Sequence, residues 1–517
     1  MRKSIIIFAL LVAAGICGMC YAHSTLSAAQ DNVSFTVVEE YGDISAADSL
    51  TVSVMAHMDY HLLWETAHTF GQTPRRRTDF SFHASQLQWL PEFVSSPISL
   101  SIPIAVNANA SGGNLLGDGE GSLIFNTEFI GVYDMLQDVA SRTQNGGQRT
   151  ETLYLRDYFD YYPIYADIRA GEYDYLRQAA AQHIFQTSDE AEVNEAFSDF
   201  FRFPVPEWRT ITITISKDIA GNVVEIRTGR ANAGYSHETG VVSEEDLVYI
   251  YAVGVITEHG IYFTLSTEGI SDFTGIPGGF GIYLLPAAKI IGEPGTEYLP
   301  TLDYKNIQTV YPLGDSTTVA ELKFIRSLML SEDSSCLNLI TYEDGICFLT
   351  VIELESMAEK QKMPLFVDMG DTLLYIANFV DGLLYAALGD NRFMLAEKNA
   401  DNTYRPVLAG ARDYLLSIED FLYWNEPQIA WDGKRLALVT PYRRYIPVDA
   451  DVFHYSNVDT CGFTLEIHGE SGLMYKGAYE SSLDVLTISA MSYDICRLVG
   501  AGGLGGLSAR WQETISP

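Results

Sequence analysis

Aromatic rings and carboxylates alternate in one short segment of the chain, D-Y-F-D-Y-Y-P-I-Y-A-D, which runs from Asp157 to Asp167. Aromatic faces beside carboxylates suit sugar rings or cationic groups as ligands. Tyrosines are also common at the packed seams of β proteins, so packing stays the alternative interpretation. If the segment binds a ligand, which would be a protein or a glycan, the candidate residues are Asp157, Tyr158, Asp160, Tyr161 and Tyr162.

Two acidic loops have the composition of a calcium site. The loop 114–120 contains Asp118 and Glu120, and the loop 399–402 contains Asp401. Calcium takes oxygen ligands from flexible loops and is abundant outside cells. Neither loop has the complete EF-hand pattern, and ordinary solvated turns are the alternative. Calcium is therefore the one cofactor that the sequence suggests, with Asp118, Glu120 and Asp401 as candidate ligands.

Three histidines, His57, His61 and His68, lie close together in the sequence. On a helix, His57 and His61 would share one face and could chelate zinc. The alternating residues from Leu50 to Tyr60 indicate a strand instead, which places the two imidazoles about 13 Å apart at roughly 3.3 Å per residue. One metal ion cannot bridge that distance, so we expect solvent-facing or loop histidines.

No sequence motif names a reaction. The glycines at 500–505 match the spacing of a dinucleotide-binding loop, but the βαβ unit that the loop requires is missing. His237-Glu238 has no second histidine at the spacing of a zinc protease, and no G-x-S-x-G nucleophile elbow occurs. We therefore predict no catalytic residue.

The first 22 residues have the composition of an export signal, with basic Arg2 and Lys3, an apolar stretch, and small residues before a polar region. Cleavage is expected after Ala22. The alternative is an uncleaved anchor through residues 4–22, the one stretch expected to touch a membrane. The sequences before Cys17 and Cys20 fit a lipid-attachment motif poorly. We expect an extracytoplasmic protein, either secreted or tethered to the cell envelope.

Acidic residues outnumber basic ones by 67 to 32 in a chain of 517 residues, for a formal net charge of −35. Such a surface repels phosphate backbones and anionic lipid headgroups, so nucleic acid is not an expected partner. Since 47% of the residues are hydrophobic and only 19% are charged, the chain can bury a large core.

Four cysteines follow the export signal: Cys336, Cys347, Cys461 and Cys496. Between the first two lies Asp344-Gly345, which has the composition of a two-residue hairpin turn. That turn would pair Cys347 with Tyr342 and Cys336 with Glu353, about 20 Å apart along the hairpin. We therefore predict two buried thiols here and leave the disulfide state of Cys461 and Cys496 open.

Three Asp-Gly pairs, with their glycines at Gly345, Gly382 and Gly433, interrupt β-favouring runs at intervals of 37 and 51 residues. Asp-Gly suits the positive φ angles of a type I′ turn, so each pair predicts a hairpin. Further hairpins are expected around residues 220–222, 258–260 and 470–472. The glycines at 221 and 260, and those at 433 and 472, are 39 residues apart, a length typical of four-stranded propeller blades.

The stretch from Pro427 to Val439, P-Q-I-A-W-D-G-K-R-L-A-L-V, resembles the S-P-D-G-K-R-L-A hairpin of Tol-type and peptidase-type β-propeller repeat proteins. The Ser-Pro that usually precedes Asp-Gly is missing, and the two other copies in this chain are degraded. In those families the motif turns between inner strands of a blade. The resemblance therefore implies a fold and no activity.

These patterns predict an all-β, β-propeller-like fold of about seven blades (six to eight) with a helical insertion. Strands are expected at 50–56, 98–106 and 210–215. Within the insertion, a capping box at 187–190 and an apolar stripe that includes Val193, Phe197 and Phe201 predict a helix that ends before Pro204. The expected parts are the signal or anchor at 1–22, N-terminal β segments that form the first blades at 30–150, the mixed or helical insertion at 151–206, and propeller-like repeats at 207–517.

The favoured function is that of an exported or envelope-associated binding protein with an unknown protein or glycan ligand and no identifiable catalysis. A second hypothesis is a secreted hydrolase or lyase acting on carbohydrate or peptide, whose carboxylates come from separate blades and so leave no motif. A third is a membrane-anchored extracytoplasmic sensor whose first helix stays in the bilayer.

Overall fold

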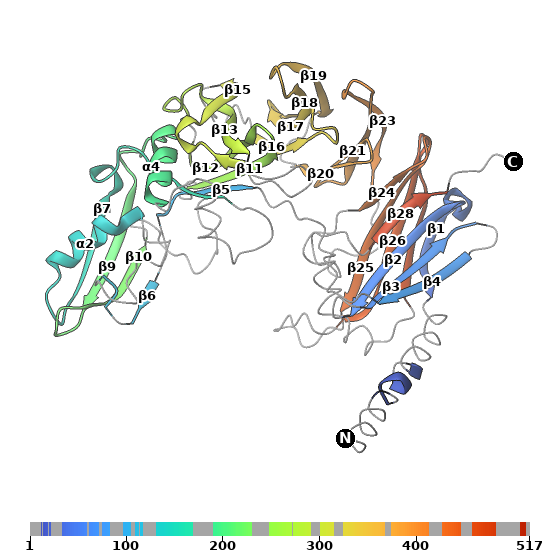
Figure 1. Ribbon diagram of the computed structural model, residues 1–517, viewed down its shortest axis with the longest axis horizontal. Coiled ribbons are helices and arrows are strands. Elements are labelled where there is room, and N and C mark those ends of the chain that lie inside the picture. The colour runs from blue at the N-terminus through green and yellow to red at the C-terminus, as the bar shows by residue number, and fades with distance from the viewer. Residues whose placement is uncertain are drawn as a thin grey trace, which may run out of the picture. The chain divides into compact units, whose positions relative to one another are not determined.

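A computed structural model of the protein shows a chain built mainly of antiparallel strands (Figure 1). The chain divides into two compact units: unit 1 joins residues 1–93 and 372–517, and unit 2 is residues 94–371. The boundaries expected at residues 150 and 206 stay a prediction. The structure describes residues 12, 14–18, 20–21, 34–58, 62–71, 75–82, 97–104, 109–112, 114–116, 131–168, 190–229, 248–270, 272–290, 300–314, 324–367, 374–412, 427–445, 458–481 and 507–512.

The described strands of unit 2 form antiparallel sheets with the orders β6-β10-β9-β7, β5-β8, β11-β12-β13-β14 with β15 also on β13, and β16-β17-β18-β19. Alternation builds their cores: Ile211, Ile213 and Ile215 of β9 are buried, and the threonines between them are not. The strands are β5 (Ile98–Ser101), β6 (Asn109–Ser111), β7 (Gln148–Tyr154), β8 (Tyr165–Ile168), β9 (Thr210–Lys217), β10 (Val223–Gly229), β11 (Tyr249–Thr257), β12 (Gly260–Glu268), β13 (Phe280–Ile290), β14 (Pro300–Leu302), β15 (Gln308–Gly314), β16 (Phe324–Leu330), β17 (Cys336–Glu343), β18 (Ile346–Glu353) and β19 (Glu359–Phe366).

Unit 1 contains the sheets β1-β27-β26-β25-β24, β28-β2-β3-β4 and β20-β21-β22-β23. Four-stranded antiparallel meanders such as β16 to β19 and β20 to β23 have the strand order of a propeller blade, so the all-β, propeller-like prediction is confirmed, whereas the number of blades stays a prediction. The strands are β1 (Phe35–Gly42), β2 (Leu50–Met58), β3 (Leu62–Thr69), β4 (Arg75–Phe82), β20 (Leu374–Val380), β21 (Leu383–Leu388), β22 (Arg392–Lys398), β23 (Tyr404–Ala411), β24 (Gln428–Trp431), β25 (Leu436–Tyr445), β26 (Val458–Gly469), β27 (Gly472–Ser481) and β28 (Leu507–Trp511).

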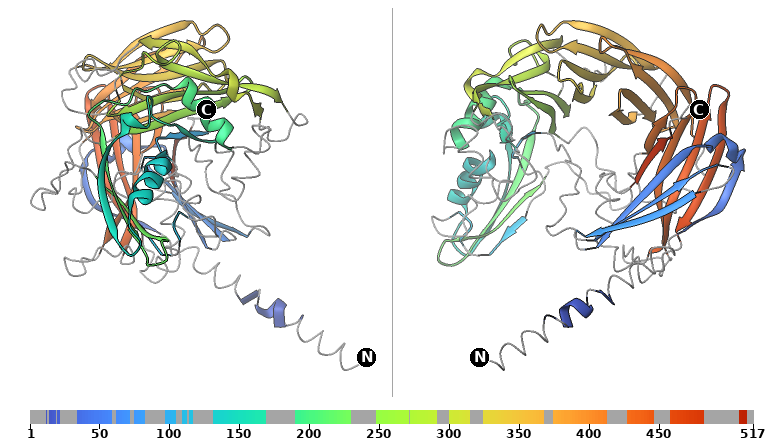
Figure 2. Two further views of the ribbon diagram at one scale, coloured as in Figure 1. Left: turned by 90° about the vertical axis from the view of Figure 1, so that its left-hand side faces the viewer. Right: turned by 45° about the vertical axis from the view of Figure 1, so that its right-hand side comes forward.

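Strands from the two ends of the chain complete each other's sheets in unit 1. β1 pairs with β27, and β28 pairs with β2. Figure 2 shows these first strands in blue beside the last ones in red. The ends of the chain are therefore held together by main-chain hydrogen bonds rather than by a local hairpin.

Two of the three Asp-Gly turns have the predicted geometry. Asp344 and Gly345 have φ angles of 50° and 76°, and Asp381 and Gly382 have φ angles of 49° and 73°. The strand registers leave only these two residues in each turn. A type I′ turn requires positive φ at both positions. The twist of this turn type matches the twist of the flanking strands.

The turn type predicted for the third Asp-Gly pair is wrong. Trp431 of β24 pairs with Leu436 of β25, which leaves a four-residue loop. Gly433 has a φ of 91°, but Asp432 has no positive φ. The Asp432 carboxylate instead accepts the backbone N–H of Arg435 at 2.6 Å and so closes a wider loop. The hairpins expected around 220–222, 258–260 and 470–472 are confirmed as β9–β10, β11–β12 and β26–β27.

The cysteine register is confirmed. In the β17–β18 hairpin, Cys336 pairs with Glu353 and Cys347 pairs with Tyr342. Both side chains are buried, and neither forms a disulfide. The side chain of Cys461 and the whole of Cys496 lie outside the described residues.

Besides the helical residues near the N-terminus, at 14–18 and 20–21, the described residues contain the helices α2 and α4, of which only α4 was expected. α4 (Glu190–Phe200) lies in the predicted insertion, and Val193, Phe197 and Phe201 of its apolar stripe are buried, whereas the capping box at 187–189 lies outside the described residues. α2 (Tyr133–Arg142) lies outside the predicted insertion at 151–206 and was not expected. Its buried residues Met135, Leu136, Val139 and Ala140 have the spacing of an amphipathic helix.

Near the N-terminus, Cys17 and Cys20 are exposed. No helix among the described residues has both the length and the hydropathy that a membrane crossing requires. The export signal and its cleavage stay predictions.

Candidate functional site

In unit 2, the segment after β7 and the segment before β9 continue the pairing of these two strands. The backbone N–H of Leu155 donates to the carbonyl of Arg209 at 3.0 Å, and the N–H of Val205 donates to the carbonyl of Asp160 at 3.1 Å. The prolines at 204 and 206 lack an N–H group and cannot prolong a regular ladder. The two segments therefore form an irregular ribbon that carries most of the predicted ligand-binding residues.

Three aromatic side chains on this ribbon are exposed to solvent: Tyr154 is 53%, Tyr161 is 44% and Trp208 is 62% exposed. We call these three residues the aromatic strip. Arg202 lies 5.9 Å from the centre of the Tyr161 ring, and Arg209 lies 5.2 Å from that of Trp208. A guanidinium over an aromatic face favours one orientation of the ring, so two of the three rings are partly ordered before any ligand arrives.

Two of the predicted residues lie in internal contacts. The Tyr158 hydroxyl donates to Oδ2 of Asp138 on α2 at 2.6 Å, and burial together with this hydrogen bond raises the pKa of Tyr158 to about 12. Tyr162 is only 2% exposed, and its hydroxyl accepts a hydrogen bond from Nε of Arg209 at 3.3 Å. Packing is the role that the structure gives to Tyr162.

The other predicted residues of the segment are open to solvent. Asp157 and Asp160 are exposed, and Arg156 forms an ion pair with Asp160 at 3.4 Å. Tyr161 belongs to the aromatic strip. Stacking surfaces with neighbouring carboxylates and guanidinium groups can hold a sugar or a cationic group. Because these groups are open to solvent and lie on two paired segments, the geometry suits the binding of a ligand.

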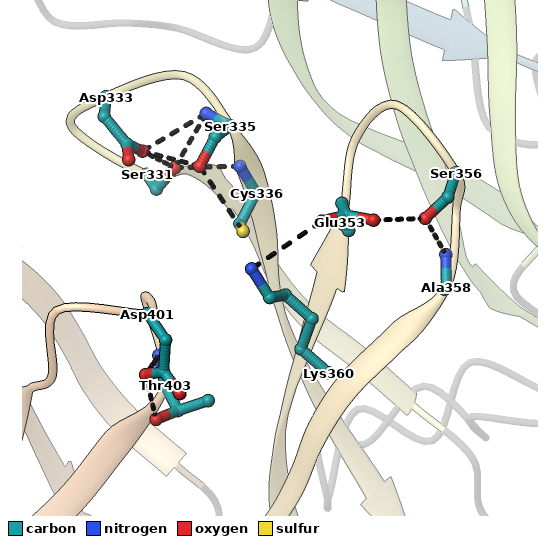
Figure 3. A network of polar contacts seen from close by, with 10 residues as sticks. All are labelled: Ser331, Asp333, Ser335, Cys336, Glu353, Ser356, Ala358, Lys360, Asp401 and Thr403. Carbon is teal, nitrogen blue, oxygen red and sulfur yellow. Dashed lines mark hydrogen bonds and ion pairs between the residues drawn. The ribbon is translucent and has the colours of Figure 1, made fainter.

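The calcium candidates are only partly visible. Asp118 and Glu120 lie outside the described residues. Asp401 lies in the β22–β23 turn, where its carboxylate accepts the backbone N–H and the hydroxyl of Thr403 at 3.1 and 2.6 Å (Figure 3). These bonds give Asp401 the role of a turn-forming residue. Calcium binding there stays a prediction.

A second polar turn, between β16 and β17, brings serines beside an aspartate (Figure 3). Asp333 accepts from the hydroxyls of Ser331 and Ser335 at 2.7 and 2.9 Å, and Ser331 accepts the backbone N–H of Cys336 at 2.9 Å. The hydrogen bonds close a tight hairpin.

Metal binding by the N-terminal histidines has no support in the described part of the chain, where no group of three or more His, Cys, Asp or Glu could hold a metal ion. β2 is a strand through Met58, as the alternation predicted. The ring of His68 packs edge-on against Phe70 with 4.7 Å between centres. The side chain of His57 and the whole of His61 lie outside the described residues.

A buried ionic cluster in unit 1 was not predicted. Arg412, which follows β23, donates from Nε and Nη2 to Oε1 of Glu466 on β26 at 3.0 and 2.9 Å. His468 donates from Nε2 to Oε2 of the same carboxylate at 3.1 Å. The three residues are 6%, 3% and 1% exposed, so a substrate in solvent cannot reach them. The cluster joins strands from two sheets and is structural.

Two residues of the aromatic strip, Tyr154 and Trp208, were not among the predicted ligand-binding residues. Trp208 is a lone aromatic residue between Pro206 and the start of the β9 alternation, a position typical of an exposed turn. That signal was available. Tyr154 continues the alternating polar pattern of β7, and only its pairing with Thr210 places it opposite the start of β9, two residues after Trp208.

The strands and the solvent-exposed aromatic strip define an all-β, propeller-like protein with a candidate binding surface.

No protein-family model matches the chain, and no curated protein matches it. Solved structures similar to it include a putative 6-phosphogluconolactonase from Bacteroides fragilis, with 11% identity, 78% of this chain and 93% of the other covered, and a TM-score of 0.25. The periplasmic gluconolactonase of Pseudomonas aeruginosa has 10% identity over 53% of this chain and 78% of its own, with a TM-score of 0.21. The Cps50 β-propeller domain of Myceliophteria thermophila has 10% identity over 52% and 78%, with a TM-score of 0.21. Similarities at this level assign neither a substrate nor a reaction.

Proposed function

We propose that the protein is an exported or envelope-associated binding protein, which holds its ligand on the aromatic strip of unit 2. The observation that supports the proposal is the exposure of Tyr154, Tyr161 and Trp208 on two paired segments. Exposed aromatic side chains pay little conformational entropy when they become ordered and dominate the binding energy of many interfaces. The neighbouring aspartates supply acceptors for hydroxyl or ammonium donors on the ligand.

Libraries of glycans and of basic peptides test this proposal. Once a ligand is found, Trp208→Ala should weaken binding on the order of 30-fold, because truncating an anchoring tryptophan typically costs about 2 kcal/mol or more. Tyr251→Ala is the matched control, since Tyr251 of β11 is 65% exposed and lies outside the strip. Equal losses in both variants would contradict the proposal.

The same libraries separate binding from catalysis. The proposal expects each bound glycan or peptide to be recovered unchanged after long incubation with the protein, as measured by mass spectrometry. Turnover that a single carboxylate substitution abolishes would establish the hydrolase or lyase alternative instead.

A further inference from the structure

Along β7 and β9, one face of the sheet β6-β10-β9-β7 is lined by hydroxyl and amide side chains. Because side chains alternate along a strand, every second residue of β7 and β9 shares this face. The strand register sets them opposite each other in cross-strand pairs. We call the following six residues the hydroxyl face: Gln148, Thr150, Thr152, Thr212, Thr214 and Ser216.

Each pair on the hydroxyl face is joined by a hydrogen bond. The hydroxyls of Thr150 and Thr214 are 2.9 Å apart, and those of Thr152 and Thr212 are 3.1 Å apart. Nε2 of Gln148 donates to the Ser216 hydroxyl at 3.1 Å. Successive pairs are two residues apart, so the rows repeat at about 6.8 Å along the sheet.

Unused hydrogen-bonding capacity remains on every threonine pair. Two hydroxyls offer two hydrogens and four lone pairs, and the bond between them uses one of each. One donor and three acceptor positions are therefore free on each pair. Thr150 and Thr152 are exposed, and Thr212 and Thr214 are partly exposed, so a ligand can reach these groups.

The opposite face of the same sheet is covered. Ile211, Ile213 and Ile215 are buried there, and α2 packs its apolar side against the sheet. The hydroxyl face is therefore the solvent side of a sheet whose other side is packed. The pairing of Tyr154 with Thr210 brings the row of pairs to the aromatic strip at its end.

The hydroxyl face carries no ionisable side chain, although the chain as a whole has a formal net charge of −35. On the same face, β10 places Glu225 opposite Ser216 and Arg227 opposite Thr214. Glu225 is paired with Arg227 at 2.5 Å and accepts from Ser216 at 2.9 Å, so the two charges offset each other. A charged ligand would have to compete with this internal ion pair. A protein partner would find no apolar residues for the core of an interface.

We propose that the hydroxyl face binds an uncharged polysaccharide chain that extends along the face to the aromatic strip. Sugar hydroxyls are both donors and acceptors, as the free groups of the threonine pairs require. The threonine methyl groups and the ring of Tyr154 supply contacts for the C–H faces of the sugars. The inference rests on the proposed function and specifies the chemical class of its ligand.

Affinity electrophoresis of the full chain tests the inference with uncharged gels of β-glucan, xylan, galactomannan and hydroxyethylcellulose. Carboxymethylcellulose is the matched anionic probe, because it shares the backbone of hydroxyethylcellulose. At least one uncharged polymer should retard the protein. A charged derivative of that polymer should retard the protein less than the uncharged polymer does. Likewise, carboxymethylcellulose should retard it less than hydroxyethylcellulose.

Valine variants locate the binding surface. Thr150→Val/Thr214→Val removes the hydroxyls but keeps the side-chain shape and the β-propensity, so the fold should persist, as thermal melting can verify. Loss of two ligand hydrogen bonds should weaken retention about tenfold. Thr36→Val on the exposed strand β1 of unit 1 is the control and should bind like the wild type.

The results distinguish the inference from the proposed function. If no uncharged polymer retards the protein, or if the double valine variant binds like the wild type, the inference is wrong. If Trp208→Ala abolishes binding of a ligand that the double valine variant still binds, the proposed function stands and the inference fails. If both variants weaken the binding of the same uncharged polymer and Thr36→Val does not, both are supported.

Discussion

At the residue scale, the buried carboxylate of Glu466 illustrates how the protein keeps a charge in its interior. Burial alone would raise the pKa of Glu466, but the positive charge of Arg412 and the hydrogen bonds from Arg412 and His468 outweigh burial and hold that pKa below its usual range. Phe393 covers the His468 ring edge-on at 4.9 Å between centres. The carboxylate is therefore ionised at neutral pH, and its stabilisation depends on two partners.

Glu466→Gln should destabilise unit 1 by about 3 kcal/mol, because it leaves Arg412 buried without its counter-charge. Chemical denaturation measures this difference. The double variant Arg412→Met/Glu466→Leu should be less destabilised than Glu466→Leu alone, since removing both charges leaves none unpaired. If the double variant has the lower stability, the ion pair is not the cause.

The same cluster predicts a pH dependence of stability. A carboxyl with a depressed folded-state pKa contributes stability above its unfolded pKa of about 4.3, and that contribution is lost as the pH falls toward the folded value. The free energy of unfolding of the wild type should therefore fall more steeply below about pH 4 than that of Glu466→Gln. Parallel curves for the two proteins would show that Glu466 does not titrate in this way.

Gly477 has a residue-scale role that follows from its neighbours on β27. Tyr475 and Tyr479 lie on the same face of the strand, and their hydroxyls are 2.5 Å apart. A Cβ at Gly477 would lie 2.5 Å from the Tyr475 hydroxyl and 2.9 Å from Cε2 of Tyr479. Both rings are buried, so neither can move into solvent.

Gly477→Ala should lower the stability of the protein by about 1 to 3 kcal/mol, because overpacking a well-packed core forces rings and backbone to shift. Gly229→Ala on β10 is the control, since a Cβ there meets no atom within 4 Å. Thermal melting compares the two. Equal melting temperatures would mean that the tyrosine pair tolerates the added methyl group.

At the element scale, the two-residue turns at Asp344-Gly345 and Asp381-Gly382 owe their form to backbone preference rather than to packing. No atom lies within 4 Å of a Cβ built on Gly345, and only one does so at Gly382, at 4.0 Å. Side chains would fit in this space, and the positive φ angle is what excludes most of them. The turn is therefore a test of conformational strain without steric overlap.

Gly345→Val and Gly382→Val should each cost about 1 to 3 kcal/mol, since a β-branched residue is a strong outlier at positive φ. Asparagine at the same positions should be milder. Gly229→Val, in a strand with ordinary φ and open space, is the control. If the valine variants at the two turns have the same melting temperature as Gly229→Val, the turn assignment loses its support.

At the scale of the whole molecule, unit 1 depends on both ends of the chain. Leu507 of β28 is buried, and the backbone N–H of Gln512 donates to the carbonyl of Ser49 at 2.9 Å. Arg435 of unit 1 lies 4.1 Å from the ring of Trp511. The last strand therefore supplies packing and hydrogen bonds that no neighbouring segment of the sequence can replace.

Deletion of residues 507–517 should expose the edge of β2 and lower the protection of β2 and β3 against hydrogen exchange. The hairpin β17–β18 belongs to unit 2 and should keep its protection. Mass spectrometry of exchange in the full chain and in the truncated chain measures both regions together. Unchanged protection of β2 and β3 would show that β28 contributes little to unit 1.

The sequence by itself determined the features that depend on neighbours a few residues apart. Asp-Gly chemistry predicted two type I′ turns, and the register of one of them predicted the separation of Cys336 and Cys347, because a two-residue turn leaves no freedom in the pairing beyond it. Alternation predicted the strands β2 and β9. The third Asp-Gly turn differs because the Asp432 carboxylate accepts from the backbone, a side-chain preference that competes with the type I′ geometry.

Only the tertiary structure decided which distant residues meet. The pairing of the segments after β7 and before β9 leaves Trp208 in solvent and buries Tyr162, although both are aromatic residues in turn-rich stretches. β28 pairs with β2, and Arg412 forms an ion pair with Glu466. No local sequence pattern connects the residues of either pair. The physical reason is that burial and ion pairing depend on the free energy of the whole packed arrangement, whereas turn and strand preferences act through the backbone of each residue and its immediate neighbours.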